Sequence, residues 1–578
     1  MKISKLFGIY IGLVTVASTA YAQSDLVNFS GLGRVYVAHD KLTGDAVKDD
    51  TTSKKRATNG YTLFDLGINV SPNESFRGTV ILRAKNNFGG FYGDGSSLNI
   101  RQFKIEGVLG KIVKYQIGDI DLGLTPYTLY NFQEVYNEYE SDIFKIRRDI
   151  THYENFNFGS KWRLQGLDAK TTLKFAKVID KLKLNAFGTR IKRANFATNE
   201  PDRLLYGGRV HVIQSDFFEI AGNLTGISDL TGSVRDSVLQ YDNIVYSTDF
   251  KGKYEGEKFE LGLLGELGTS TYSFKSERIK SRNASYEDYF MDLGVKAAYK
   301  PGNFIIGVDG SYREVGAQFS SPGAQTRRIF DYSQSNTFDR MNNNTTVRSQ
   351  TLFDRMTNET LYNQSIQTVL MPFLPEYNNL TPYGIATPNR KGTTANLVIR
   401  HKEKFGQLSF TSEMLTEILG EGTTTLRTFS GLRGGAQINI DKILKFKKLI
   451  SLTGGYRSEQ TTRDGELSVD LKSTIIDAGL TVEVLKNVDL MGGYKTFTGN
   501  GNEYVARRNV YSGLIQDYLN YNVNSTEDIV SFGLRYRFSN KSFFTGNYQI
   551  ITYKNKLVTA VNRNYNIDQL FLNYTLVF

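Results

Sequence analysis

Alternation of apolar and polar residues recurs along almost the whole chain, and it constrains the fold more than any other feature. In the run 62–70, Phe64, Leu66 and Ile68 share one face, opposite Asp65 and Asn69. Side chains of a strand point to opposite faces with period two, so each such run predicts a strand with one apolar face. A soluble sandwich does not explain so many strands without a second core. Similar runs follow at 76–85, 259–267, 289–299, 304–312, 476–484 and 530–538.

The connections between these runs alternate in length. Short turns are expected near 72–75, 110–111, 179–181, 214–215, 255–258, 301–302, 403–404, 441–447, 485–487 and 539–541. Long polar connections are expected near 39–60, 87–96, 121–166, 193–202, 229–242, 273–284, 316–392, 418–424, 463–467, 500–525 and 555–564. Short turns facing long loops are typical of a transmembrane antiparallel up-and-down β-barrel. The sequence therefore predicts an all-β barrel of about 22 strands, with 18–22 as the plausible range.

The first residues indicate a secretory signal peptide. Lys2 and Lys5 precede an apolar run from Leu6 to Ala17, and small residues follow up to Ala22. The run is too short to span a hydrocarbon core of about 30 Å, and its end fits a cleavage site before Gln23. We expect residues 1–22 to be removed and residues 23–578 to form a single barrel domain. No segment looks like a linker, and the first strand begins too early for an N-terminal plug domain.

The other end of the chain carries a second signal. In the segment LFLNYTLVF, Tyr574 and Phe578 share an apolar face with Leu570, Leu572 and Leu576. This pattern resembles the terminal targeting signal of Gram-negative outer-membrane β-barrel proteins of the porin-like class. The resemblance covers the last strand and implies location in the cell outer membrane. It also implies contact with outer-membrane lipid and lipopolysaccharide, and recognition by the barrel-assembly machinery during biogenesis.

Charged residues of both signs fall on the polar faces of the predicted strands. An Arg or Lys facing lipid near mid-membrane costs about 2–4 kcal/mol, so these residues are expected to face the lumen. They support two interpretations, a polar pore that weakly favours anions and an internal lattice of salt bridges. The expected lumen-lining residues are Arg77, Arg83, Lys85, Arg209, Arg433, Arg457, Arg535 and Arg537.

The longest connection, 316–392, is the strongest candidate for a functional segment. Loops of this length are usually functional or disordered, and its apolar and aromatic residues argue against disorder throughout. A barrel of about 22 strands must hold water or a plug. We expect this loop to fold into or over the lumen, where Arg327, Arg328, Tyr332 and Phe338 would form a constriction or a docking surface. The second long connection, 121–166, also carries several aromatic residues.

Enzymatic and nucleic-acid functions find no support. The chain has no Cys, its four His are scattered, and no catalytic or phosphate-binding motif occurs. No catalytic, cofactor or metal site is therefore expected. The net charge is +11, or +9 without Lys2 and Lys5, but the basic residues are dispersed and not clustered as nucleic-acid binding requires.

Two hypotheses of function remain. The first is a channel for hydrophilic solutes whose lumen is constricted or capped by 316–392. The second is a non-conducting barrel subunit that binds other envelope proteins through its external loops, in an assembly, secretion or uptake complex.

Overall fold

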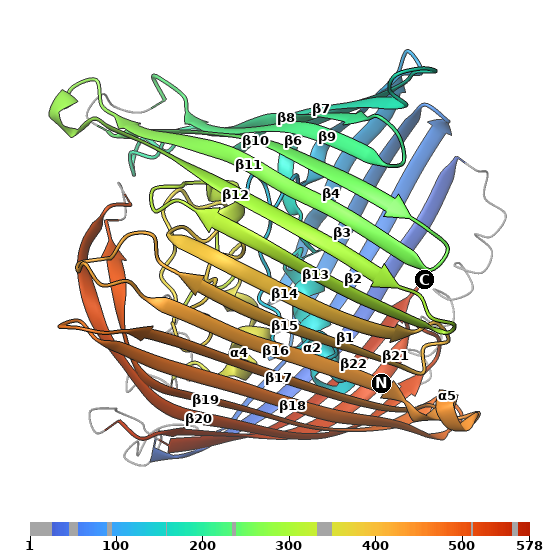
Figure 1. The fold of residues 1–578 in the computed structure, drawn as a ribbon. Helices are drawn as coiled ribbons and strands as arrows, with labels where there is room; N and C mark the ends of the chain where they lie inside the picture. Colours follow the sequence, from blue (N-terminus) through green and yellow to red (C-terminus); the bar gives the residue numbers. More distant parts are fainter. Residues whose placement is uncertain are drawn as a thin grey trace.

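The computed structural model is a single closed antiparallel sheet of 22 strands, in which the first and last strands pair (Figure 1). It describes residues 26–45, 56–89, 95–157, 159–233, 238–331, 349–509, 513–557 and 564–578. Each strand pairs with its neighbours in sequence, and β1 also pairs with β22, from Leu32 opposite Val577 to Gly44 opposite Tyr565. The expected all-β up-and-down barrel is confirmed. The expected cleavage site lies outside the described residues.

The strands have the following bounds. The first eleven are β1 Val27–Gly44, β2 Arg56–Asn73, β3 Phe76–Asn87, β4 Ser96–Leu109, β5 Val113–Leu122, β6 Trp162–Lys174, β7 Lys181–Lys192, β8 Arg203–Ile213, β9 Phe218–Asp229, β10 Gln240–Glu255 and β11 Phe259–Lys275. The others are β12 Ala284–Tyr299, β13 Phe304–Val315, β14 Arg390–His401, β15 Gly406–Thr416, β16 Thr428–Asn439, β17 Ile450–Arg463, β18 Val469–Leu485, β19 Val488–Arg508, β20 Ile515–Arg537, β21 Phe543–Asn555 and β22 Asn564–Val577.

The turns fall where the sequence predicts them, whereas some loops are shorter than expected. The long connection expected at 500–525 is wrong, because β19 runs to Arg508 and β20 begins at Ile515. At this end of the hairpin the outward positions are polar, with Asn500 opposite Asn524 and Asn502 opposite Asn522, so the apolar outer face is lost while the backbone ladder continues. The expected loop 121–166 is also too long, since β6 begins at Trp162.

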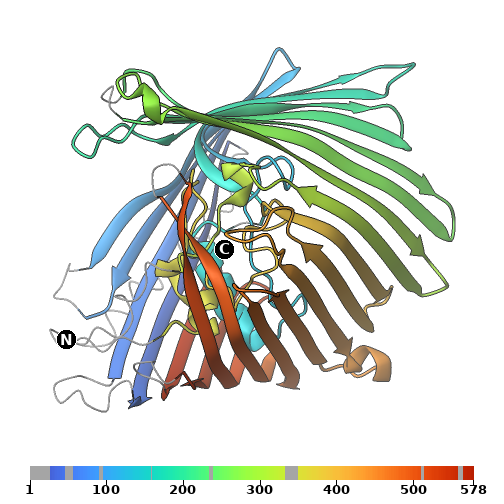
Figure 2. The ribbon, with the colours of Figure 1, turned by 60° about the vertical axis from the view of Figure 1, so that its left-hand side comes forward.

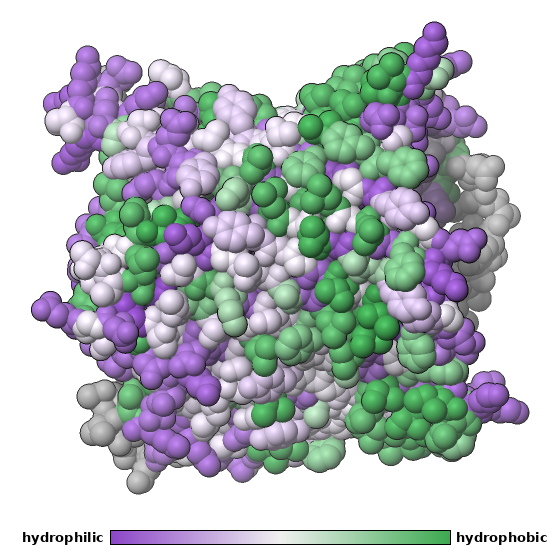
Figure 3. All heavy atoms as spheres, in the orientation of Figure 1, coloured by the Kyte–Doolittle hydropathy of each residue, from purple (hydrophilic) through white to green (hydrophobic). Residues whose placement is uncertain are grey.

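The outside of the barrel is apolar along the middle of its strands. Leu263, Val295 and Val308 are more than half exposed on neighbouring strands, and Figure 3 shows apolar residues spread over this face with hydrophilic residues gathered at the strand ends. Such a surface is stable against lipid. No helix among the described residues has the length and apolar character needed to cross a membrane.

The inside of the barrel is occupied by the two long connections. We call the described parts of segments 123–161 and 316–389, namely residues 123–157, 159–161, 316–331 and 349–389, together the plug; Figure 2 shows them within the ring of strands. The plug contains the helices α2 Asp142–Glu154, α3 Pro322–Gln325 and α4 Leu352–Thr357, and the 3-10 turn η4 Glu359–Leu361. Outside the plug, η3 Lys280–Arg282 follows β11 and α5 Ile440–Leu444 follows β16.

Candidate functional site

The plug packs against the inner wall through several apolar clusters. The largest joins Ile143 and Phe144 of α2 and Phe353 of α4 to Phe497 of β19 and Phe571 of β22. A second cluster joins the plug to β5–β11, and a third joins it to β10, β12 and β13. The plug therefore contacts the wall on several sides and forms a folded core within the lumen.

A buried charge cluster joins the two segments of the plug. The Glu134 carboxylate accepts from Arg327 at 2.5 Å and from Arg355 at 2.8 Å, and the Tyr136 hydroxyl also donates to it. Asp331 pairs with Arg327 at 2.9 Å and also with Arg355. These carboxylates and guanidiniums balance in charge, and their side chains are almost completely buried.

The ionisation of Glu134 depends on this arrangement. Burial alone would raise the pKa of its carboxyl, but the guanidiniums of Arg355 and Arg327 lower the pKa to about 2. Glu134 is therefore ionised at neutral pH. Removing one partner of such a cluster leaves an uncompensated buried charge, which typically costs about 3–5 kcal/mol. The cluster therefore holds segments 123–161 and 316–389 together.

One side of the plug is anchored to β18–β20. The ammonium of Lys495 in β19 lies 2.5 Å from Glu140 of the plug and 2.9 Å from Asp477 of β18. Nearby, Arg535 of β20 contacts Asp142, the first residue of α2, at 2.7 Å. These contacts tie the beginning of α2 to the wall.

The end of α2 is anchored to β1–β4. Arg34 of β1 lies 2.7 Å from the Glu154 carboxylate, and Tyr61 of β2 donates to the same group. The Tyr153 hydroxyl donates to Asp65 of β2 at 2.6 Å, and Arg101 of β4 donates to the Tyr153 carbonyl. Between these two anchors, Arg147 of α2 donates to Gln569 of β22, so the helix runs along the inner wall from β18–β20 past β22 to β1–β4.

The residues expected to line the lumen lie on the inward faces of their strands, and most are in ion pairs. Arg77 pairs with Glu106, Arg83 with Asp65, Lys85 with Glu154, Arg209 with Asp249, Arg457 with Glu459, and Arg535 and Arg537 with Asp489. Arg433 shares the inner face with the buried Phe429 and is itself exposed. Of the two interpretations, the arrangement fits an internal lattice of salt bridges better than a pore lined by unpaired cations.

The residues expected in the long loop are only partly described. Arg327 belongs to the charge cluster, and Arg328 donates to the Asn363 and Asn155 carbonyls. Burial lowers the pKa of the Arg328 guanidinium to about 10. Tyr332 and Phe338 lie outside the described residues.

The two residues expected to direct barrel assembly lie on the outer face of β22 and just after it. Tyr574 pairs with Val35 of β1, and the Phe578 ring stacks on Phe64 of β2 with centroids 5.7 Å apart. The Phe578 amide also donates to the Gly31 carbonyl at 3.1 Å. Both residues therefore lie at the seam that closes the barrel.

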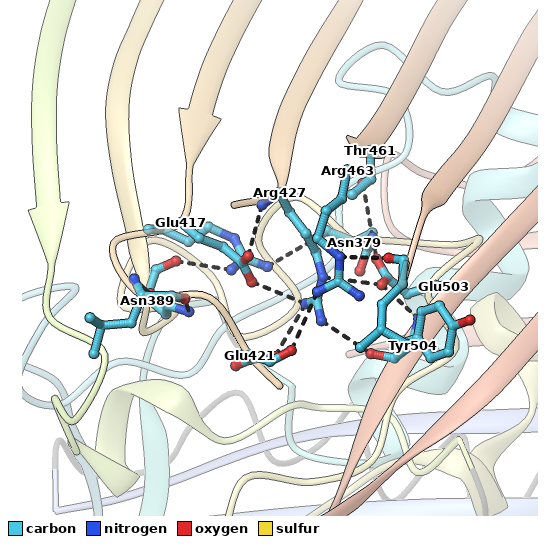
Figure 4. A network of polar contacts seen from close by, with 12 residues as sticks. Asn379, Asn389, Glu417, Glu421, Arg427, Thr461, Arg463, Glu503 and Tyr504 are labelled. Atoms are coloured by element: carbon cyan, nitrogen blue, oxygen red, sulfur yellow. Dashed lines mark hydrogen bonds and ion pairs between the residues drawn. The ribbon is translucent and has the colours of Figure 1, made fainter. Parts of the chain in front are cut away.

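A second polar network lies where the plug meets the long-loop ends of β15, β16 and β19 (Figure 4). Arg427 contacts Glu417 and Glu421 at 3.2 Å and Glu503 at 3.3 Å. The amide of Asn379 in the plug donates to Glu503 at 2.6 Å. A cavity of about 400 Å³ adjoins this network, and its lining includes Met371, Phe373, Pro382, Tyr383, Val505 and Leu519.

Sequence reasoning did not find Glu134, Asp331 or Arg355. Glu134 and Arg355 come from different connections, and a single sequence gives no signal that pairs residues so far apart. The alternating pattern that identified the wall residues is absent in the plug. The signal available in the sequence is charge placed directly beside an apolar segment: Arg327 and Arg328 precede Ile329-Phe330, and Asp331 follows it.

The closed wall, its apolar outer surface and its charged inner face together decide the class of protein. The chain folds as a transmembrane β-barrel of the outer-membrane type. No known family matches its sequence, and no curated protein matches it.

Solved structures resemble the barrel only distantly. A BenF-like porin from Pseudomonas fluorescens has 10% identity and a TM-score of 0.36, with 96% of this chain and 99% of that chain covered. OpdK of Pseudomonas aeruginosa, solved with vanillate, has 7% identity and a TM-score of 0.36, with 95% and 99% covered. The Escherichia coli capsule-assembly protein Wzi, a carbohydrate-binding barrel, has 10% identity and a TM-score of 0.34, with 77% and 83% covered. These values are too low to transfer an activity.

Proposed function

We propose that the protein is a channel for hydrophilic solutes in which the plug sets the constriction. The observation that carries this proposal is the buried cluster of Glu134, Arg327 and Arg355, which fixes two loop segments inside a wide barrel. A wall of this size encloses more space than its own side chains can fill. The plug occupies that space, so it determines what passes.

The charged inner wall supports a polar solute. Arg433 is exposed on the inner face, and Arg535 and Arg537 share the Asp489 carboxylate. Fixed charges of this kind select solutes by charge and size. The excess of basic residues favours anions.

Single-channel conductance of the purified barrel in planar bilayers tests the proposal. Deleting 317–388 removes one plug segment while keeping the ends of β13 and β14, and it should raise conductance several-fold. Replacing Glu134 with Gln should increase the frequency of openings without changing the width of the wall. Unchanged conductance in both variants, with the barrel folded, would contradict the proposal. The exposed Lys472, replaced by Met, is the matched control.

The alternative is a non-conducting subunit of an envelope complex, which binds partners through its external loops. The anchoring of the plug to two separate sectors of the wall favours this function, since a plug fixed in the lumen blocks passage. The same deletion separates the two proposals. It would leave conductance unchanged but release a co-purified partner if the barrel is such a subunit.

A further inference from the structure

Among the described residues, the wall is interrupted where β5 and β6 separate from their neighbours. The register between β4 and β5 runs from Leu109 opposite Val113 to Lys104 opposite Gly118 and stops there. β4 nevertheless continues to Ser96, and β5 continues to Leu122. On the other side, the β6–β7 register stops at Gly166 opposite Thr189. The tips of β5 and β6 therefore pair with each other and leave the wall together.

A pair of glycines marks the point of departure. Gly118 and Gly166 lie opposite each other in the β5–β6 register. Gly118 has φ of +99°, a conformation that strains other residues. A Cβ on it would lie 2.4 Å from the Phe103 carbonyl, and one on Gly166 would lie 2.2 Å from the Gly188 carbonyl. The bend is thus built into the sequence at two opposed positions.

We call residues 119–122 and 162–165 the flap. Its inner face is buried: Ile120, Leu122 and Trp162 pack with Phe187 of β7 and Leu205 of β8. The Trp162 indole donates to the Gly323 carbonyl of the plug at 2.9 Å. The flap therefore lies against the plug within the lumen. The β4–β5 and β6–β7 registers both stop where the flap begins, and we call the region between β4 and β7 beyond these points the slot.

The rim of this slot is apolar. Leu98 is 73% exposed, Ile100 is 67% exposed, and Phe103 is half exposed, all on β4 beside the point where pairing stops. Further along the same strand, Leu109 is also exposed. The apolar outer belt of the barrel therefore extends along β4 as far as the unpaired part of the strand.

The back of the slot is polar, in contrast to its rim. The outward positions of the flap are Asp119, Asp121, Arg163 and Gln165. Arg163 donates to both oxygens of Asp121 at 2.8 Å, and the Phe103 amide donates to the Asp119 carboxylate at 2.5 Å. A side chain thus replaces the missing strand at this amide.

A hydrocarbon chain alone would not satisfy the polar groups of the flap. An open sheet edge and a charged back wall in lipid would leave polar groups unsatisfied. A polar solute would find no polar side chain to bind on the rim of Leu98, Ile100 and Phe103. An amphiphile satisfies both, with its chain on the rim and its polar head against the flap. Three strand spacings of about 4.8 Å would separate β4 from β7, which admits an acyl chain.

A simpler explanation is that the flap bends only to lead 123–161 into the lumen. That explanation accounts for the inward course of Leu122 and for Arg163, whose guanidinium lies 5.4 Å from the ring centre of Phe156 in the plug. It does not account for the exposed Asp121 and Gln165 on the outward face. A chain entering the lumen could also leave β5 beyond its last wall residue, as it does after β13, where pairing with β14 extends from Phe304 to Val315.

We propose that the slot is a lateral portal that binds an outer-leaflet lipid, with an acyl chain on Leu98 and Ile100 and the polar head at Asp121 and Arg163. This site is separate from axial passage through the barrel. It gives the protein access to a membrane amphiphile from the side.

The natural chain has no Cys, so single-cysteine labelling tests the portal directly. Three variants carry the same environment-sensitive fluorophore: Leu98→Cys on the rim, Gln165→Cys on the flap and Arg433→Cys on the inner wall. Each folded barrel is placed in phosphatidylcholine vesicles whose acyl chains are brominated. The flap label should be quenched about as strongly as the rim label and several-fold more than the inner-wall label.

Two results would overturn the proposal. If the flap label is quenched no more than the inner-wall label and is reached by aqueous iodide, the slot contains water. If the flap label is shielded from both quenchers, a polypeptide covers it. Since labelling at Gln165 could disturb the flap, a second label at Asp119→Cys repeats the measurement. Agreement of the two flap labels decides the outcome.

Discussion

Two junctions of the barrel wall differ in how completely their strands pair: the seam between β1 and β22, and the junction between β4 and β5. We relate the first to folding and the second to function. The seam between β1 and β22 joins strands from opposite ends of the chain, yet their register is unbroken from Leu32 to Gly44. β4 and β5 are neighbours joined by a short turn, yet their register stops at Lys104 and Gly118. Proximity in sequence therefore does not explain which junction is complete.

The difference lies in the residues at each junction. At the seam, Phe578 and Tyr574 face outward as an apolar strand should, and Phe578 stacks on Phe64. At the slot, Gly118 bends the strand and Asp119 replaces a ladder bond. The interruption is therefore specified by the sequence, as a bulge or bend near a functional site usually is.

Damage at the seam should have the largest effect. Replacing both Tyr574 and Phe578 with Ala should prevent most of the protein from reaching the folded barrel, because an unsealed β1–β22 edge cannot remain in lipid. Heat-modifiable migration on a gel measures the folded fraction. Tyr548→Ala, which removes an exposed aromatic from the adjacent strand β21, is the control and should fold normally. Normal folding of the double variant would show that these residues do not seal the barrel.

The next largest effect is expected where the beginning of α2 is anchored to β18–β20. Lys495→Met keeps the length of the side chain but leaves Glu140 and Asp477 buried without their cation. The free energy of unfolding should fall by about 3–5 kcal/mol. Urea titration of the reconstituted barrel measures it, with Lys472→Met on the outer face of β18 as the control. Equal stability of the two variants would show that the plug is not anchored through Lys495.

The bend of the flap should be sensitive to a single methyl group. Gly118→Ala should destabilise the protein by at least about 1 kcal/mol, because Ala is strained at positive φ. It should also shift the flap, so that lipid quenching of a label at position 165 changes. Gly188→Ala is the matched control, since Gly188 lies beside the flap and a Cβ there meets open space. If both substitutions behave alike, the glycine pair does not set the bend.

The sequence predicted the wall better than the plug, for a physical reason. Strands in lipid must alternate, and turns such as 72–75 and 485–487 interrupt the alternation, so local pattern alone located most of the strands. The prediction of a loop at 500–525 was wrong because the outward face of the hairpin end is polar, with paired asparagines such as Asn502 and Asn522, and so lacks the apolar face that marks the other strands.

The site was less predictable. Arg327 was singled out by its type, but its partner Glu134 lies in another loop, and their pairing depends on how both loops fold inside the wall. The flap lies largely within the loop expected at 121–166, because Gly118 and Asp119 break the alternation. This loss of apolar and polar alternation at Gly118 and Asp119 is the sequence feature that marks the bend of β5.

The smallest expected effect concerns the part of the plug behind the slot, and it depends on pH. Burial, together with the nearby charges of Arg148 and Arg328, lowers the pKa of His152 to about 3. The folded plug therefore holds this imidazole neutral, whereas the unfolded segment takes up a proton near the ordinary value of 6.5. His152 thus stabilises α2 above pH 6.5, and this contribution is lost progressively as the pH falls toward 3.

Hydrogen exchange of the α2 amides, corrected for the intrinsic pH dependence of exchange, measures this loss. Between pH 6.5 and pH 4.5 the opening of α2 should increase by up to about tenfold per pH unit in the natural protein. Glu134 does not interfere in this range, because the Arg355 and Arg327 charges overcome the effect of burial and keep its pKa near 2. His152→Gln should make the opening nearly independent of pH, while Lys495→Met should raise it equally at both values. A pH dependence that survives His152→Gln would show that a group other than His152 controls the opening of α2.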